Sequence, residues 1–380
     1  MNAPKLRFKE FNDEWKKAQI SSFVNINPKN DSLPEKFVYI DLESVNNGLL
    51  TSRKVINKSE APSRAQRTIV KNDILYQTVR PYQMNNLFIN RLDSDYPYIA
   101  STGYALLRTE ENPYFVYSIL YQKAFVNKVL NMCTGTSYPA ISANDLGTIF
   151  VCLPSIREQE KISRTLELLD KKIELQSKKI EDLKLFKLEL KERLFKIFET
   201  KQIELKDIII KWNKKNKDNK YSYVESVSNK YGFIAQNEQF EDRNVASNDT
   251  KNYYVIEKGV FAYNPSRLNV GSLALKGNNK VSLVSPLYEC FITNQNNKFL
   301  YEWFNSKEFK KGTVSKFEGG VRNTLNFSNL CKIKISLPSL ENQGKISNIL
   351  NLYNNLIRLE SQKLNKLIEL KKGLMQNMFV

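Results

Sequence analysis

Two stretches of the chain share a hydrophobic pattern that is typical of long paired helices. In residues 153–200 and 337–380, apolar residues recur at alternating spacings of three and four, which is a heptad repeat. A helix of about 40 residues rises about 1.5 Å per residue, so each stretch predicts a rod of about 60 Å that supercoils against a partner. The predicted coiled-coil core positions are Leu166, Leu169, Ile173, Ile180, Leu183 and Leu190, followed by Leu350, Tyr353, Ile357, Leu364, Leu367 and Leu374.

Each long helix is expected to begin after a Leu-Pro-Ser triplet. Ser155 and Ser339 are suitable N-caps, and Glu158 stands where the acid of a capping box would stand. Both heptad stripes are interrupted by polar residues at equivalent core positions, a pattern that commonly fixes helix register and partner. The interruptions pair Gln176 with Glu360 and Lys187 with Lys371.

The helical stretches belong to a repeat that covers most of the chain. The block L-P-S-x-x-x-Q-x-K-I-S occurs at 153–163 and again at 337–347, a shift of 184 residues. Identical residues continue at the same shift far upstream, where Phe115, Tyr117 and Phe125 match Phe299, Tyr301 and Phe309. Because a repeat decides the architecture, we divide the chain into globular segments 1–152 and 201–336, a central helix 153–200 and a C-terminal helix 337–380.

The two globular segments are predicted to be α+β domains. Runs rich in β-branched and aromatic residues predict strands at 37–40, 74–76, 104–107 and 260–263. The aromatic stretches 114–125 and 299–309 predict short amphipathic helices that pack on a sheet. The long helices can pair with each other, pair with other proteins or form an ordinary hairpin in one core. Pairing within the chain is favoured because a folded segment separates them.

Composition restricts the setting and the chemistry. No apolar run reaches the roughly 20 residues that span a bilayer, no secretory signal is evident, and the four cysteines are widely spaced, so we predict a cytoplasmic protein. There is no histidine, no G-x-G loop and no P-loop, which argues against a self-contained enzyme and against a metal site. A net charge of +18 fits a nucleic acid partner, although a solvated lysine-rich surface gives the same charge.

Candidate DNA-contacting residues lie in polar turns that follow the predicted strands. Arginine pairs with guanine, asparagine and glutamine pair with adenine, and hydroxyl groups bind bases or phosphates. Each candidate taken singly also fits an ordinary turn residue. The candidates are Gln77, Thr78, Arg80, Tyr82, Ser137 and Tyr138 in the first domain, and Asn264, Ser266, Arg267, Asn269, Arg322 and Asn323 in the second.

Taken in order, these features resemble the specificity (S) subunit of type I restriction-modification systems. The residues that carry the resemblance are the opening Pro4-Lys5-Leu6-Arg7-Phe8 with Trp15, the Arg80-Pro81 pair, and the two L-P-S-x-x-x-Q-x-K-I-S blocks with their helices. The resemblance extends over essentially the whole chain.

The resemblance implies two target-recognition domains that read the halves of an interrupted, asymmetric DNA site. It also implies an antiparallel coiled coil that sets the gap between the halves. The subunit would be non-catalytic and need no cofactor. Two adenine-methyltransferase (modification) subunits would carry S-adenosylmethionine, and restriction/translocase subunits would carry ATP and Mg. A stand-alone two-domain DNA-binding regulator and a coiled-coil scaffold are the alternatives.

Overall fold

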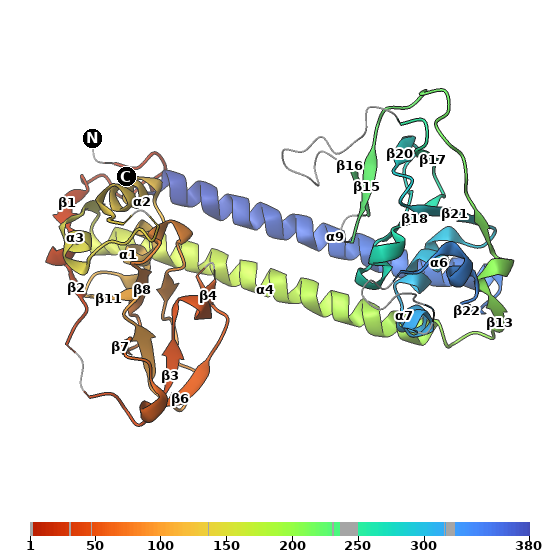
Figure 1. Cartoon of the computed structure of the whole chain (residues 1–380). Coiled ribbons are helices and arrows are strands. Elements are labelled where there is room, and N and C mark those ends of the chain that lie inside the picture. Colours follow the sequence, from red (N-terminus) through yellow and green to blue (C-terminus); the bar gives the residue numbers. More distant parts are fainter. Residues whose placement is uncertain are drawn as a thin grey trace. The chain divides into compact units, whose positions relative to one another are not determined.

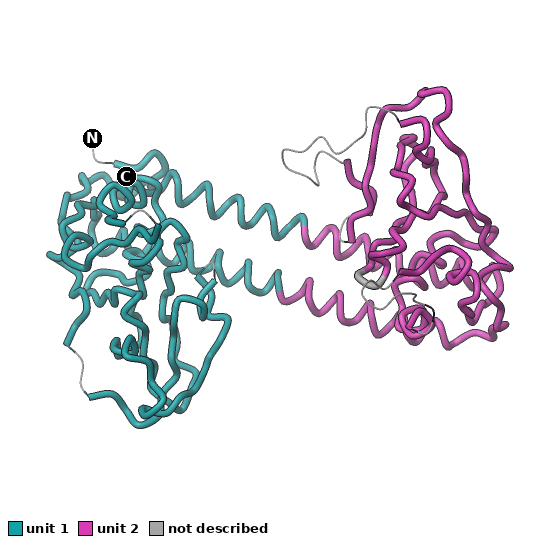
Figure 2. The backbone as a smooth tube through the Cα atoms, viewed as in Figure 1, with its two compact units in different colours: residues 1–177, 362–380 teal, residues 178–361 magenta. Residues whose placement is uncertain are grey.

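A computed structural model describes residues 3–29, 32–46, 48–135, 137–229, 232–235, 250–314, 316 and 324–380, and it leaves the side chains of 269 and 270 undescribed. The chain forms two compact units (Figure 2). Unit 1 consists of residues 1–177 and 362–380, and unit 2 of residues 178–361. Both unit boundaries fall inside a long helix, so each unit contains one globular domain and one half of each helix.

The long helices agree closely with the heptad pattern. Helix α4 spans Ile156–Leu194 and helix α9 spans Leu340–Asn377 (Figure 1). Each begins directly after the serine that was predicted to cap it. The hydroxyl of Ser339 accepts a hydrogen bond from the backbone N–H of Asn342 at 3.4 Å, whereas α4 starts with backbone hydrogen bonds to the carbonyl of Ser155.

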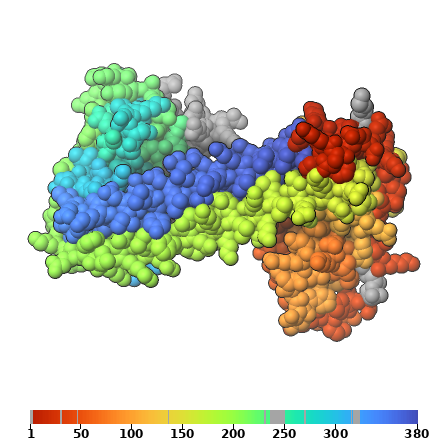
Figure 3. All heavy atoms as spheres, turned by 180° about the vertical axis from the view of Figure 1, so that it is seen from behind, coloured from red at the N-terminus to blue at the C-terminus, as the bar shows by residue number. Residues whose placement is uncertain are grey.

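Glu158 does not complete a capping box, because its carboxylate is bound by Arg7. Two guanidinium nitrogens of Arg7 donate to the two oxygens of Glu158, each at 2.8 Å, and Glu158 is 1% exposed. The neighbouring N–H of Leu6 donates to the carbonyl of Asn377 at 2.8 Å. The N-terminal segment therefore binds both the start of α4 and the end of α9, as Figure 3 shows for the red and blue ends of the chain.

The two helices run antiparallel in both units, which confirms the predicted pairing. In unit 1, Lys371 of α9 lies 2.5 Å from Asp170 of α4. In unit 2, Lys179 lies 2.9 Å from Glu360, and the rings of Phe186 and Tyr353 are 5.4 Å apart. Of the twelve predicted core positions, Leu166, Leu169, Ile180 and Leu350 are buried and the other eight are half-buried.

The domain of unit 1 has two four-stranded sheets. The first contains β2 (Val24–Ile26), β11 (Tyr104–Thr109), β8 (Ile74–Gln77) and β9 (Leu87–Phe88), in that order. The second contains β6 (Lys54–Asn57), β3 (Lys36–Ile40), β10 (Tyr98–Ser101) and β7 (Ala65–Ile69). Strands β3 and β10 are parallel while the other pairs are antiparallel, so this sheet is mixed.

Short ribbons and helices complete unit 1. Strand β1 (Lys16–Gln19) pairs with β12 (Phe150–Leu153), and β4 (Val45–Asn46) with β5 (Leu49–Leu50). The predicted aromatic helix at 114–125 is two helices, α1 (Pro113–Ile119) and α2 (Lys123–Met132), and α3 (Ala143–Thr148) follows. The 3-10 turns are η1 (Ile20–Ser22), η2 (Leu42–Ser44), η3 (Lys58–Glu60) and η4 (Pro81–Gln83).

Unit 2 repeats this plan with shorter strands. One sheet contains β14 (Ile209–Lys211), β21 (Glu289–Thr293), β18 (Phe261–Tyr263) and β19 (Leu273–Leu275). The strand pairs are β13 (Lys201–Glu204) with β22 (Lys334–Leu337), β15 (Glu225–Ser228) with β16 (Gly232–Ala235), and β17 (Tyr254–Ile256) with β20 (Ser282–Val284). The helices are α6 (Asn297–Phe304), α7 (Lys307–Val314) and α8 (Phe327–Cys331), with turns η5 (Leu205–Asp207) and η6 (Pro265–Val270).

The repeat extends to the packing of single aromatic rings. Phe379, at the end of α9, stacks on Phe115 of α1 with ring centroids 5.2 Å apart. In unit 2, Phe195 meets Phe299 of α6 at 5.5 Å. Both pairs are related by the same shift of 184 residues. The end of each long helix therefore closes the core of the domain in its unit through an equivalent ring contact.

In the part of the chain that the structure describes, no helix is long and apolar enough to cross a membrane. The cytoplasmic location inferred from the sequence stays a prediction.

Removal of the Phe379 ring is expected to destabilise unit 1. Phe379 is 7% exposed, and Phe379→Ala deletes a buried aromatic side chain, a change that costs about 3 kcal/mol of unfolding free energy. Val380→Ala is the matched control, because Val380 is 47% exposed. Denaturant unfolding followed by near-UV circular dichroism measures both. Equal midpoints for the two variants would show that the C-terminal ring is not part of the core.

Candidate nucleic-acid interface

The polar turn after β8 has an unusual backbone in unit 1. Arg80 (φ 54°) and Met84 (φ 51°) both adopt left-handed conformations, and they flank the 3-10 turn Pro81–Gln83. A left-handed backbone at a residue other than glycine costs free energy and persists where the surroundings impose it. We call residues 80–84 the proline turn of unit 1.

Two of the predicted DNA-contacting residues, Gln77 and Thr78, are buried next to this turn. Gln77 is 1% exposed. Its amide nitrogen donates to the carbonyl of Val79 and to Oε1 of Gln83, both at 2.8 Å. Its amide oxygen accepts from the N–H of Asn85 at 3.1 Å. Thr78 is 8% exposed and donates to the carbonyl of Gly103 at 2.9 Å. Burial and these contacts assign Gln77 to holding the turn, whereas Thr78 binds the chain at Gly103.

The remaining candidates of unit 1 lie at the surface. Tyr82 is 49% and Tyr138 is 63% exposed, Ser137 is also exposed, and Arg80 is half-buried. The backbone N–H of Arg80 donates to the carbonyl of Pro139 at 2.7 Å, and its guanidinium lies 4.3 Å from the Tyr138 ring centroid. The structure thus brings the turn and the loop at 137–140 together as one polar surface.

Sequence reasoning missed two exposed residues of the same turn, Gln83 and Met84. The Arg80-Pro81 pair marks the start of the turn in the sequence, but the left-handed conformation at Met84 depends on support from Gln77. Proximity to a proline was the only local signal that pointed to them.

Unit 2 has a proline turn at the equivalent place. The turn Pro265–Val270 follows β18, and Pro265 lies 184 residues after Pro81. The side-chain oxygen of Asn264 accepts from the N–H of Ser266 at 3.0 Å, so this candidate caps the turn. Ser266 and Arg267 are exposed.

The other candidates of unit 2 are only partly described. Asn269 lies within η6, and its side chain is outside the described residues, as are Arg322 and Asn323. Just after them, the N–H of Leu325 donates to the carbonyl of Pro265 at 3.0 Å, so the returning chain contacts the proline turn here too.

The glutamine of the repeated L-P-S block connects each long helix to its domain. Gln159 is fully buried; its amide nitrogen donates to Glu111 at 2.7 Å and to the carbonyl of Pro154 at 3.1 Å, and its oxygen accepts from the N–H of Asn112 at 3.2 Å. Asn112 in turn caps α1 through the N–H of Phe115 at 2.9 Å. We call this set of contacts the glutamine joint.

The glutamine joint recurs in unit 2 with the same geometry. Gln343 is fully buried, donates to Gln295 and to the carbonyl of Pro338, each at 2.9 Å, and accepts from the N–H of Asn296 at 3.0 Å. Asn296 caps α6. Since a buried amide side chain requires partners, the motif glutamine is explained by this bonding.

A second polar contact joins the first helix of each domain to both long helices. In unit 1, the hydroxyl of Tyr114 on α1 donates to Asp170 on α4, which also pairs with Lys371 on α9. Burial, together with the negative charge of Asp170, raises the pKa of Tyr114, so its hydroxyl stays protonated and donates. We call this contact the polar junction of unit 1.

The polar junction of unit 2 is centred on Glu302 of α6. Lys187 of α4 donates to its Oε1 at 2.8 Å and Asn354 of α9 at 3.1 Å, while Lys191 lies 3.7 Å from its Oε2 and donates to the carbonyl of Asn305 at 2.8 Å. Burial raises the pKa of Glu302, but the hydrogen bond and charge of Lys187, the hydrogen bond of Asn354 and the charge of Lys191 together outweigh burial, so the pKa is lowered. Burial lowers the pKa of Lys191, and Glu302 offsets part of that change. Lys187 is therefore the main partner of the carboxylate.

Both long helices also carry large apolar side chains that are about half exposed or more. Six of these are related by the 184-residue shift and are between 48% and 67% exposed. We call them the outer stripe: Leu168, Leu175 and Leu370 in unit 1, and Leu352, Leu359 and Phe186 in unit 2. Single exposed leucines are ordinary, but the same positions are apolar in both units.

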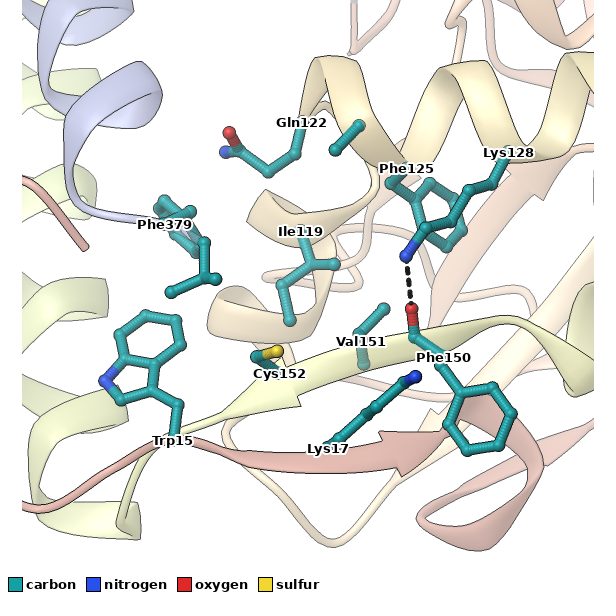
Figure 4. Close-up of a pocket in the computed structure, with 12 residues that line it drawn as sticks. Trp15, Lys17, Ile119, Gln122, Phe125, Lys128, Phe150, Val151, Cys152 and Phe379 are labelled. Carbon is teal, nitrogen blue, oxygen red and sulfur yellow. Dashed lines mark hydrogen bonds between the residues drawn. The ribbon is translucent and has the colours of Figure 1, made fainter. Parts of the chain in front are cut away.

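A pocket of about 70 Å³ in unit 1 lies beside the β1–β12 ribbon (Figure 4). Its lining includes Ile119, Phe125 and Phe379, and at its edge Lys128 donates to the carbonyl of Phe150 at 2.8 Å. In unit 2 the residue equivalent to Ile119 is Trp303, which is 1% exposed. The pocket thus reflects a smaller side chain in unit 1. In the described part of the chain, no cluster of three potential metal-binding side chains occurs.

Comparison with known proteins gives a family match over most of the chain. The model of the type I restriction modification DNA specificity domain matches residues 12–185 and again 194–369. The HindI specificity subunit, a type I restriction enzyme subunit from Haemophilus influenzae, is 28% identical over 144 residues, which are 36% of this chain. The match spans 31% of that relative's own length.

Solved structures share the fold. A chain from a study of complex assembly and conformational transition of the type I R-M system has a TM-score of 0.58 at 19% identity and covers 96% of this chain and 97% of its own. The S subunit of a type I restriction-modification system from M. genitalium has a TM-score of 0.55 at 17% identity, with 100% and 99% covered.

Loss of the Glu302 carboxylate is expected to destabilise unit 2 in a pH-dependent way. Glu302→Gln leaves two lysines without their acid, which costs about 3 kcal/mol of unfolding free energy near pH 7. The folded pKa of Glu302 lies below its ordinary value of 4.5. Its stabilisation is therefore present above pH 4.5 and is lost as the pH falls through the folded pKa.

Denaturant unfolding at a series of pH values measures this difference. The gap between the parent chain and Glu302→Gln should narrow as the pH falls below 4.5. Glu341→Gln is the control, because Glu341 pairs with Lys345 on an exposed helix surface, where ion pairs contribute little. A gap that is the same at every pH would contradict an ionised Glu302.

Proposed function

This chain belongs to the family of type I restriction modification DNA specificity domains, and from that premise we propose that it is the DNA specificity subunit of a type I restriction-modification complex. It reads a bipartite, asymmetric target in double-stranded DNA and positions modification and restriction subunits on it. The family model matches the chain twice, once over each domain with its long helix, which supports one reader for each half of the target.

One observation supports the asymmetric target most directly. The two proline turns follow equivalent strands and start at equivalent prolines, but they expose different side chains. Unit 1 presents Tyr82 with Gln83, and unit 2 presents Ser266 with Arg267 at the same repeat positions. Since bases are distinguished by the donors and acceptors of the side chains that reach them, two such turns read two different sequences. The net charge of +18 favours the phosphate contacts that position them.

The catalytic steps belong to partner subunits in this proposal. The sequence has no histidine and no glycine pair spaced as a G-x-G loop, the usual elements of phosphate and dinucleotide binding and of general base catalysis. We assign S-adenosylmethionine to two adenine-methyltransferase subunits, and ATP with Mg to restriction subunits. The chain itself is the non-catalytic reader.

The outer stripe is the surface that we assign to the methyltransferase subunits. Each unit exposes the same set of three apolar positions, such as Leu168 in unit 1 and Leu352 in unit 2. A surface that occurs once in each unit accepts two copies of one partner, and exposed apolar patches commonly mark protein interfaces. The repeat thus explains a stoichiometry of two modification subunits to one reader.

Co-expression with an adenine methyltransferase of this system is expected to methylate one bipartite DNA motif in the host genome. Single-molecule sequencing identifies the motif and the gap between its halves. A genome with no methylated bipartite motif would refute the proposal. A stand-alone regulator would instead bind a specific site tightly without the methyltransferase, and a scaffold would show no salt-dependent affinity for DNA.

Side chains of the two proline turns are expected to affect separate halves of that motif. Arg267→Ala should lower the discrimination between correct and incorrect bases at one half-site by about 1–3 kcal/mol per lost base contact, which is about tenfold or more. Tyr82→Ala should lower the discrimination only at the other half-site. Arg157→Ala on α4 is the control, since Arg157 is exposed on the helix and away from both turns in sequence. Relaxation of both halves by either variant would contradict separate readers.

A charged residue in the outer stripe of one unit is expected to weaken binding of the methyltransferase subunit at that unit only. Leu352→Glu introduces a carboxylate into the apolar surface of unit 2, so the purified complex should shift from two methyltransferase subunits per reader towards one. Native mass spectrometry measures the ratio. Gln362→Glu adds the same charge at an exposed position of the same helix and should leave the ratio unchanged. An unchanged ratio in Leu352→Glu would show that the stripe is not the docking surface.

A further inference from the structure

Each recognition domain is attached to the long helices at two points through one short helix. In unit 1, α1 is capped by Asn112, which binds the glutamine joint, and its Tyr114 reaches the polar junction at Asp170. In unit 2, α6 is capped by Asn296 at the glutamine joint, and its Glu302 forms the polar junction with Asn354. In both units the joint and the junction are separated by about three helical turns along the long helix.

The two attachments differ in how many of the long helices they involve. The glutamine joint involves only the long helix that begins beside it. The polar junction also includes the opposite helix, through Lys371 in unit 1 and Lys187 in unit 2. A shift of the helices by one heptad would move that lysine about 10 Å along the axis and break the junction. The junction therefore links the orientation of the domain to the register of the helix pair.

The two copies share one residue of the junction, the lysine, and differ in where the carboxylate lies. At one repeat position unit 1 has Asp170 and unit 2 has Asn354, so the second copy lacks this acid. At another position unit 1 has Ser118 and unit 2 has Glu302, so there the second copy gains one. The lysine is the same in both copies, and it contacts a carboxylate in both. The carboxylate belongs to α4 in unit 1 and to α6 in unit 2, but the lysine that it contacts occupies the same repeat position in both units.

We propose that the polar junction is a spacing determinant of the DNA target. This junction holds the recognition domain through Tyr114 in unit 1 and through Glu302 itself in unit 2. It fixes the angle of each domain on the helix pair, and so sets the number of base pairs between the two half-sites, separately from the turns that read them. The junction residues are positioning residues, which act through the domains they hold. This inference rests on the proposed function and adds to it a determinant outside the reading turns.

The exchange of the carboxylate between copies supplies the test. Glu302→Ser takes the acid away and places in unit 2 the residue type that unit 1 has there. Adding Asn354→Asp together with Lys298→Tyr then supplies the acid from α9 and the hydroxyl from α6, in the arrangement that Asp170, Lys371 and Tyr114 have in unit 1. Asn354→Asp alone is the control for the added charge. Each full-length variant is co-expressed with the methyltransferase, on plasmids whose half-sites are separated by the native gap or by one base pair more or fewer.

We expect the parent chain to methylate only the native gap. Glu302→Ser should raise methylation at the off-by-one gaps, relative to the native gap, by about tenfold, with the half-site sequences unchanged. The variant with Glu302→Ser, Asn354→Asp and Lys298→Tyr should return to the strict gap. A strict gap in Glu302→Ser, no recovery in the triple variant, or a change in the half-site sequences would each overturn the inference.

A purely structural role would lower the yield or the melting temperature without any change in the preferred gap, so both are measured alongside methylation. If Glu302→Ser does not fold, Asp170→Asn tests the same junction in unit 1, where the acid side chain is 37% exposed and its loss is milder. It should broaden the accepted gap in the same direction, and a strict gap there would overturn the inference. Failure of the proposed function itself is seen separately, as absence of bipartite methylation by the parent chain.

Discussion

The antiparallel contact between the two long helices is the interaction on which the rest of this structure depends. Neither helix can bury its apolar stripe alone, because most of the stability of such a helix comes from packing of one face. Each unit is therefore built from chain segments that are far apart in the sequence. The core of unit 1 includes Met378 and Phe379 from the end of α9, and the core of unit 2 includes Leu194 from the end of α4. A domain and the far end of the opposite helix form one folded unit.

The repeat separates what must be equal in the two units from what must differ. The buried glutamines, the asparagine caps and the closing phenylalanines have the same contacts in both copies, and they hold the domain on the helices. The exposed residues of the proline turns differ between the copies. A DNA reader with two unlike half-sites needs this combination, since a common frame keeps both domains in a defined geometry while each turn is free to vary.

Polar residues in an apolar helix seam are usually discussed as devices that fix register and partner. Here one polar residue at each junction also contacts the recognition domain: Asp170 binds Tyr114 of α1 as well as Lys371 of α9, and Lys187 binds Glu302 of α6. The pKa of Glu302 is lowered because Lys187, Asn354 and Lys191 together outweigh the effect of its burial. The same low-polarity surroundings make an unpaired lysine costly, which explains why a carboxylate faces it in both units although the two acids come from different elements.

The sequence alone determined the periodic and repeated features of this protein. Heptad spacing placed the two long helices to within a few residues, because the apolar spacing of a helix can be read directly along the sequence. The 184-residue shift predicted two domains of one kind. The sequence also indicated the polar turns after the strands. Only the tertiary structure decided which residues of those turns are exposed. Gln77 and Thr78 are chemically suited to base contacts, but long-range packing buries them beneath residues such as Gln83. The role of Glu302 was equally hidden, because its partners lie on two helices that are distant in sequence and meet only when the chain is folded.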